Sequence, residues 1–98
     1  MDIETRHRLQ EAISLARRGK RRGERALLKL QAQIEDARDW MRMGDAWLNC
    51  DRVDRAIDCF ERAASRYLDE DYDKHACAML RMILDLDPEH ADARERLA

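Results

Sequence analysis

The 98-residue sequence has few of the residues that break or cross-link a polypeptide chain, with one proline, three glycines and three cysteines. It also has few β-branched residues, with one threonine, one valine and five isoleucines, which argues against a sheet protein. No apolar run approaches the ~20 residues that a membrane span requires. The segment MDIETRHR at the start lacks the apolar stretch of a signal peptide.

The cysteines show no pattern of a disulfide framework or a metal site. Cys50, Cys59 and Cys77 are odd in number and have no CxxC spacing, so we expect reduced thiols in a cytoplasmic protein. His75 and Cys77 would point about 200° apart on a helix, too far to share a metal ion. The sequence contains no glycine-rich phosphate loop, nucleophile elbow or HExxH motif. We therefore predict no enzyme activity, no metal site and no cofactor.

What the sequence does contain is 45% apolar and 41% charged residues, a mixture typical of amphipathic helices with many surface ion pairs. The net charge is only −2, so the protein as a whole has no field that would attract nucleic acid or a membrane. At this length we predict a single domain over residues 1–98, with a thin core.

Apolar residues at helical spacing predict five helices and a short sixth, over residues 3–18, 23–34, 37–49, 53–67, 73–86 and 88–98. Gly19 is expected to close the first helix in the left-handed conformation. Asp51 and Asp54 resemble a capping box for the fourth helix, and Asp87-Pro88-Glu89 is expected to open the sixth. The short turns predict an all-α array of helical hairpins, an α-solenoid.

A repeat pattern begins at Trp40, where the sequence reads W-M-R-M-G-D-A-W and continues with Ala56, Phe60 and Ala63. It resembles the tetratricopeptide signature W-x2-L-G-x2-Y, A-x3-F, with methionine for leucine and tryptophan for tyrosine. A second match starts 20 residues later and runs through Phe60, Ala63, Ala64, Tyr67, Ala76, Leu80, Ile83 and Pro88. Residues 37–98 thus resemble tetratricopeptide repeats, and residues 3–36 form a hairpin that resembles them less closely. The layout is also similar to repeat segments attached to bacterial signalling proteins.

The resemblance implies a solenoid of antiparallel helices. Small Gly44 and Ala56 would let two helices approach, while aromatic side chains fill the gaps beside them. Trp40 and Trp47 would then be core residues; the alternative is an exposed aromatic stripe that binds a partner. Met41 falls off the packed face and is expected to be an adaptable contact.

The resemblance also implies a protein-interaction function, because the first helix of each tetratricopeptide repeat usually lines a groove that holds a partner peptide or helix. Carried onto this sequence, the partner-binding candidates on the third and fourth helices are Arg38, Met41, Arg42, Asp45, Asn49, Glu61, Arg62 and Ser65. Asp45 occupies a position where the family's carboxylate-binding groove would have an amide, which argues against recognition of a partner's terminal carboxylate. The mixed charge favours a partner helix or linker that carries both signs.

A basic cluster surrounds the first predicted turn and consists of Arg17, Arg18, Arg21, Arg22 and Arg25, with Lys20 between them. The first two suit the negative end of a helix, whereas the other three lie where the helix dipole disfavours them. Three interpretations stay open: a solvated turn, a patch for an acidic protein partner and, ranked last, a site for nucleic acid or anionic lipid. No aromatic residues interleave with these bases, which weakens the nucleic-acid interpretation.

The alternative function is an oligomerisation or docking segment of a larger protein. The predicted sixth helix is short and ends as Leu97 and Ala98 reach packing positions. The fifth helix would then be partly uncovered at Met79, Met82, Ile83 and Leu86, because each repeat buries its apolar side on the next. We expect this edge to pair with a second copy as a homodimer.

Overall fold

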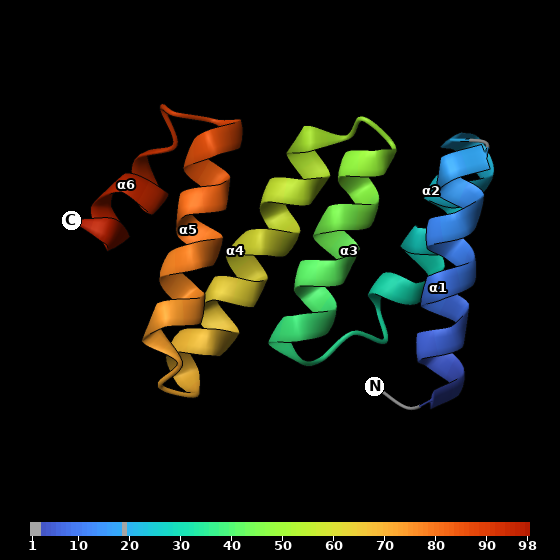
Figure 1. Ribbon diagram of the computed structural model, residues 1–98, viewed down its shortest axis with the longest axis horizontal. Helices are drawn as coiled ribbons and strands as arrows, with labels where there is room; N and C mark the ends of the chain where they lie inside the picture. Colours follow the sequence, from blue (N-terminus) through green and yellow to red (C-terminus); the bar gives the residue numbers. More distant parts are fainter. Residues whose placement is uncertain (1–2, 19) are drawn as a thin grey trace.

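The computed structural model describes residues 3–18 and 20–98, and of residues 16, 17 and 20 the backbone alone. The described residues form no strand and six helices: α1 (Ile3–Arg18), α2 (Lys20–Gln31), α3 (Ala37–Asn49), α4 (Val53–Asp69), α5 (Asp73–Leu86) and α6 (Ala91–Leu97). They lie in sequence order across the molecule, from α1 and α2 at one end to α6 at the other (Figure 1). The all-helical prediction is confirmed.

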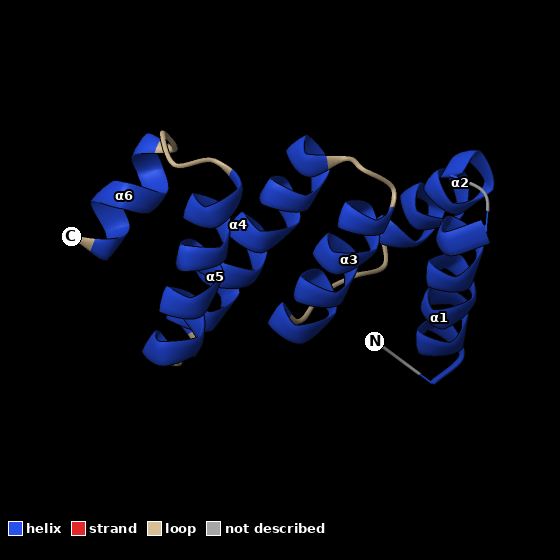
Figure 2. Ribbon diagram, turned by 45° about the horizontal axis from the view of Figure 1, so that its top comes forward, coloured by secondary structure: helices blue, strands red, loops and turns tan. Residues whose placement is uncertain are grey.

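Each helix from α3 onward packs on the next one in the sequence, and α3 also contacts α1 and α2. Short loops join α3, α4 and α5 at alternate ends, so that these neighbours run antiparallel (Figures 1 and 2). None of the described helices is both long enough and apolar enough to cross a membrane.

The bounds of α1, α3 and α5 agree with the sequence prediction, whereas α2 is shifted toward the N-terminus. It begins at Lys20 rather than residue 23 and ends at Gln31 rather than residue 34. Ile34 is nevertheless 5% exposed, because the backbone turns after the helix and returns its side chain to the core. The predicted role of Gly19 lies outside the described residues.

The turn from α3 to α4 differs from the predicted capping box. Asp51 has a left-handed backbone with φ of 58° and follows the end of α3. Its amide donates to the Leu48 carbonyl (3.0 Å), and the Arg52 amide donates to the Trp47 carbonyl (3.0 Å). These two bonds form a Schellman motif, in which the left-handed residue is usually glycine. The prediction that Asp51 caps α4 is wrong: Arg52 occupies that position, and its side chain makes no capping hydrogen bond.

The turn from α4 to α5 repeats this motif 20 residues later. Asp71 has a φ of 62°, and its amide donates to the Leu68 carbonyl (3.1 Å). The Tyr72 amide donates to the Tyr67 carbonyl (2.8 Å). The 20-residue offset between the two sequence matches therefore corresponds to one helix and its turn, with the same backbone reversal at each end of α4.

The start of α6 also differs from the prediction. The helix begins at Ala91, and His90 caps it because its Nδ1 accepts a hydrogen bond from the Ala93 amide (3.1 Å). Asp87 instead ends α5, and its carboxylate accepts a bond from the Glu89 amide (3.2 Å). The tripeptide Asp87-Pro88-Glu89 is thus the connection between the helices rather than the first turn of α6.

The tryptophans of α3 lie in the core, as predicted. Trp47 is fully buried and Trp40 is 4% exposed. Gly44 lies between them along the helix, and a Cβ added there would be 2.5 Å from Cε1 of Phe60 on α4. The close approach of α3 and α4 therefore depends on the missing side chain at this position.

The prediction that Met41 lies off the packed face is wrong. It is half-buried and packs against the core. Its position follows that of Ala37 by one helical turn, so one edge of Met41 contacts the core and the other remains exposed.

Two aspartates at the start of α3 have opposite pKa shifts. The Asp36 carboxylate caps the helix by accepting the Asp39 amide (2.8 Å). Burial raises the pKa of Asp36, but the hydrogen bonds from Asp39, together with the positive charge of Arg6, leave that pKa below its usual value. Asp39 is buried, and its pKa is raised by that burial, then by its hydrogen bond to Asp36 and by the Asp36 charge, although Arg6 opposes the shift.

We expect Asp39→Asn to increase the free energy of unfolding at neutral pH. A carboxyl whose pKa is raised in the folded state destabilises the fold when ionised; this penalty is absent below the unfolded pKa of about 4 and complete above the folded pKa. The gain from the substitution should therefore vanish as the pH falls to about 4. Urea titrations of the wild type and of Asp39→Asn, from neutral pH down to about pH 4, measure this gain. An equal difference at every pH would show that the Asp39 charge is not the cause.

Candidate functional site

The eight partner-binding candidates do not form one groove. Arg38 lines a hollow between the start of α3 and the turn from α4 to α5. Arg42, Asp45 and Asn49 line a second hollow beside α1. A third, on the other side of α4, contains Glu61, Arg62 and Ser65, and Met41 lines none of the three.

The hollow at Arg38 has a volume of about 350 Å³ and brings three helices together. Ala37 and Arg38 come from α3, Tyr67 from α4, and His75 from α5. The rings of Tyr67 and His75 stack at a tilt, with centroids 5.1 Å apart. The faces of α3 and α5 that carry Ala37 and His75 therefore lie on the same side of α4.

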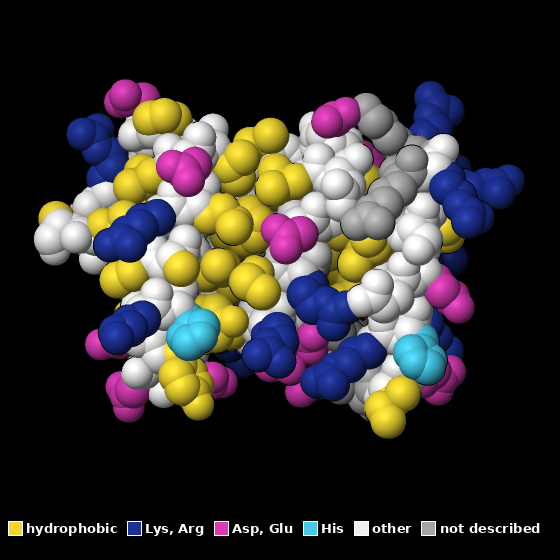
Figure 3. Space-filling model, viewed as in Figure 1, with side chains coloured by type: hydrophobic (Ala, Val, Ile, Leu, Met, Phe, Trp, Pro, Cys, Tyr) yellow, Lys and Arg dark blue, Asp and Glu magenta, His cyan; other side chains and the backbone are white. Residues whose placement is uncertain are grey.

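Helical register extends this surface along both helices. Met41 and Leu48 lie on the face of α3 that carries Ala37, and Ala78 and Met82 lie on the face of α5 that carries His75. Figure 3 shows hydrophobic side chains gathered along this side of the molecule between α3 and α5. We term it the front face, formed by Met41 and Leu48 of α3, Tyr67 of α4, and His75, Ala78 and Met82 of α5.

Most of the front face is apolar and only partly covered. Met41, Leu48, Tyr67 and Met82 are half-buried and pack against the core with one side. Ala78, which lies between His75 and Met82 along α5, is exposed. The surface thus offers partly exposed sulfur, aliphatic and aromatic groups on three helices, with a small residue on its α5 side.

Arg42, Asp45 and Asn49 face α1 rather than the front face. They share a hollow of about 230 Å³ with Gln10 and Ile13 of α1. Burial raises the pKa of the Asp45 carboxyl above its usual value. These residues therefore border the packing between α1 and α3.

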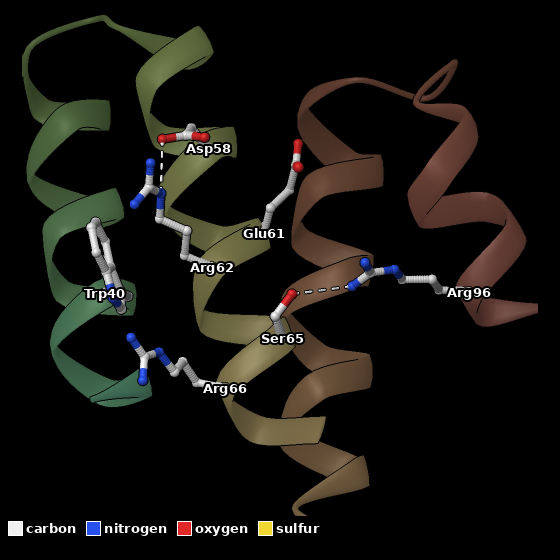
Figure 4. Close-up of a pocket in the computed structure, with 7 residues that line it drawn as sticks. All are labelled: Trp40, Asp58, Glu61, Arg62, Ser65, Arg66 and Arg96. Carbon is white, nitrogen blue, oxygen red and sulfur yellow. Dashed lines mark hydrogen bonds and ion pairs between the residues drawn. The ribbon is translucent and has the colours of Figure 1, made fainter. Parts of the chain in front are cut away.

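The third hollow, between α3, α4 and α6, has a volume of about 250 Å³. We term it the back hollow; it is lined by Trp40, Asp58, Glu61, Arg62, Ser65, Arg66 and Arg96 (Figure 4). The α4 residues recur at i, i+3, i+4, i+7 and i+8, a spacing that places them on one face of the helix. Phe60, Ala64 and Tyr67 lie on the opposite face, toward α3 and α5.

Ion pairs and a cation–π contact organise the back hollow. Arg62 lies over the Trp40 ring, 4.8 Å from its centroid, and its Nε is 3.3 Å from the Asp58 carboxylate. Glu61 contacts Nε2 of His90 at 2.9 Å. Arg96 donates to the Ser65 hydroxyl at 3.4 Å and pairs with Asp92 at 3.2 Å.

The basic cluster lies at the end of α1 and in the first turns of α2. Arg18, Arg21, Arg22 and Arg25 are exposed, and the side chain of Arg17 lies outside the described residues. Arg21 and Arg22 are helical rather than part of a turn, because α2 begins at Lys20. Arg18 borders a shallow hollow with Gln10, Glu11 and Leu15.

Two of the three cysteine thiols lie in the core. Cys50 and Cys59 are buried, and no disulfide links any of the three cysteines. Burial raises the pKa of the Cys59 thiol to about 12, so this group is not a thiolate at neutral pH.

Among the residues at these surfaces that sequence reasoning missed are Arg66, His90 and Arg96. Arg66 could have been found, because it continues the i, i+4 spacing from Arg62. His90 and Arg96 depend on how α6 packs, which the spacing within a helix does not reveal. Comparison with protein-family models, with curated protein sequences and with solved structures finds no match for this protein.

Proposed function

We propose that this protein is a non-catalytic interaction module that binds an amphipathic partner helix on its front face. The observation that carries the proposal is the apolar surface contributed by α3, α4 and α5, in which Met41, Leu48 and Met82 remain half-buried. Partner helices commonly place one apolar face against such a surface and anchor it at positions i, i+3, i+4 and i+7. The flexible thioethers of Met41 and Met82 suit this contact because they adapt to different side chains.

We further propose a tetratricopeptide-like arrangement for residues 37–98. Two observations support it: Gly44 allows the Phe60 ring to approach α3, and the α3 and α5 faces that border the front face lie on one side of α4. In this arrangement the front face corresponds to the groove that the family uses for its partners. Arg38 and His75 lie at one end of it and Asp45 on its edge, so the partner helix would carry charges of both signs.

A bulky cation at Ala78 tests the proposal. Ala78→Arg places a long side chain on the α5 side of the front face, between His75 and Met82, and the exposed position leaves the core unchanged. We expect the variant to melt like the wild type but to bind its partner at least about tenfold more weakly. This corresponds to a loss of about 1.4 kcal/mol of binding free energy. The measurement is quantitative mass spectrometry of proteins captured from an extract of the source cells. Ala32→Arg, at an exposed alanine after α2, is the matched control.

We expect Ala78→Arg to lose the proteins that the wild type captures, and Ala32→Arg to keep them. If Ala78→Arg retains the same proteins as the wild type, the front face is not the binding surface.

The second candidate is self-association through the C-terminal edge. Met82, Leu86 and Leu97 are half-buried there, and α6 is only seven residues long. Light-scattering mass over a dilution series separates the two candidates. A concentration-dependent dimer that Ala78→Arg dissociates would identify a second copy as the occupant of the front face. A monomer at all concentrations would favour a different protein as the partner.

A further inference from the structure

We propose that the back hollow binds the carboxylate of an acidic side chain in a partner protein, with Arg66 as the principal cation. This site lies on the opposite side of α4 from the front face and does not depend on the function proposed for that face. The proposal rests on the charges in the hollow, on the positions of its donors and on its size.

The guanidinium groups of the hollow are paired with acids, with one exception. Arg62 is paired with Asp58 (3.3 Å) and Arg96 with Asp92 (3.2 Å), whereas Glu61 is hydrogen-bonded to Nε2 of His90 (2.9 Å). Arg66 is exposed and makes no ion pair with any residue that the structure describes. Figure 4 shows its guanidinium directed from α4 toward α3, beside Trp40. The hollow therefore contains one guanidinium group that no acid in the described residues pairs with.

The donors around this charge are held in place by other contacts. Arg62 precedes Arg66 by one helical turn and is fixed between the Trp40 ring and Asp58. The Arg96 guanidinium, on α6, is fixed by Ser65 and Asp92. A planar guanidinium donates two parallel hydrogen bonds that match a carboxylate, so Arg66 supplies a bidentate contact with Arg62 beside it.

The size and walls of the hollow favour a single carboxylate over a polyanion. Its volume of about 250 Å³ accommodates one side chain and a short stretch of backbone. Asp58 and Glu61 lie in its wall and would repel the successive phosphates of a nucleic acid. Arg62 covers the Trp40 ring, which is 4% exposed, so no base can stack there.

Fluorescence anisotropy with a labelled hexaglutamate peptide tests the proposal, with hexaglutamine as the uncharged probe. We expect the wild type to bind hexaglutamate and not hexaglutamine. Arg66→Gln should weaken hexaglutamate binding by about tenfold, since it removes a charge-assisted hydrogen-bonding group. Arg94→Gln is the matched control: Arg94 is exposed on α6 and lies outside the hollow, and its loss changes the net charge equally.

Three results would overturn the proposal: no binding of hexaglutamate by the wild type, equal weakening by Arg66→Gln and Arg94→Gln, and tighter binding of a labelled hexathymidylate than of the peptide. Equal weakening would show attraction by net charge alone, and the third result would identify nucleic acid as the ligand. Ala78→Arg should bind hexaglutamate like the wild type. This comparison separates the two proposed sites, because Ala78→Arg alters the front face and leaves the back hollow unchanged.

Discussion

Trp47→Ala is expected to lower the free energy of unfolding by about 3–5 kcal/mol, the range for deleting a large buried aromatic side chain. Trp47 is fully buried, and Arg55 lies over its ring at 5.0 Å from the centroid. Its carbonyl accepts the amides of Cys50 and Arg52, so a cavity here lies directly beside the turn into α4. Urea denaturation followed by circular dichroism measures the loss.

Tyr72→Ala is the control for this substitution. Tyr72 is also an aromatic residue next to a helix end, but it is 53% exposed. Its removal should cost less than about 1 kcal/mol, since substitutions at exposed positions rarely cost more. Equal losses for the two variants would mean that Trp47 does not contribute as a core residue.

Gly44→Leu is expected to have the second large effect, destabilising the protein by about 3 kcal/mol or more, beyond the usual range for an overpacked contact. Even the first added carbon would lie 2.5 Å from Cε1 and 2.8 Å from Cδ1 of Phe60. Gly44→Ala should also destabilise, although alanine in a helix interior is ordinarily about 1 kcal/mol better than glycine. The sign of this smaller change distinguishes a steric conflict from helix propensity.

A double-mutant cycle identifies the Phe60 ring as the cause. Phe60→Leu removes Cε1 and Cζ, two of the three ring atoms that meet the new Cβ, so Gly44→Ala should cost less in the Phe60→Leu background than in the wild type. Additive losses would place the conflict elsewhere, and a stabilising Gly44→Ala would show that α3 and α4 do not approach closely at this point.

Helix positions were predictable because the apolar spacing is regular. In α4, Ala56, Phe60 and Ala63 repeat at the helical period, and the burial of all three follows from it. The turns were less predictable, because aspartate rather than glycine adopts the left-handed conformation at positions 51 and 71. Aspartate is also a common capping residue, so the sequence favoured a cap where the structure has a Schellman turn.

The candidate site was predictable only in part, for a physical reason. Periodicity assigns residues to faces of one helix, but not to the neighbour that each face meets. Met41 on α3 and Arg62 on α4 were therefore assigned to one groove, whereas the structure places them on the front face and in the back hollow. By helical spacing, the polar residues Asp58, Arg62 and Ser65 fall on one face of α4, and the apolar residues Phe60 and Tyr67 fall on the opposite face. That contrast was the available signal that the two sets face different ways.

Site-specific photo-crosslinking tests whether a partner binds the front face. A photoreactive phenylalanine derivative replaces His75, which is exposed at one end of the front face, or His7, which is exposed on α1. We expect illumination in cell extract to attach a partner at position 75 and not at position 7. A product of twice the 11.6 kDa protein mass would identify the partner as a second copy. Crosslinking at position 7 with none at position 75 would show that the partner does not bind the front face.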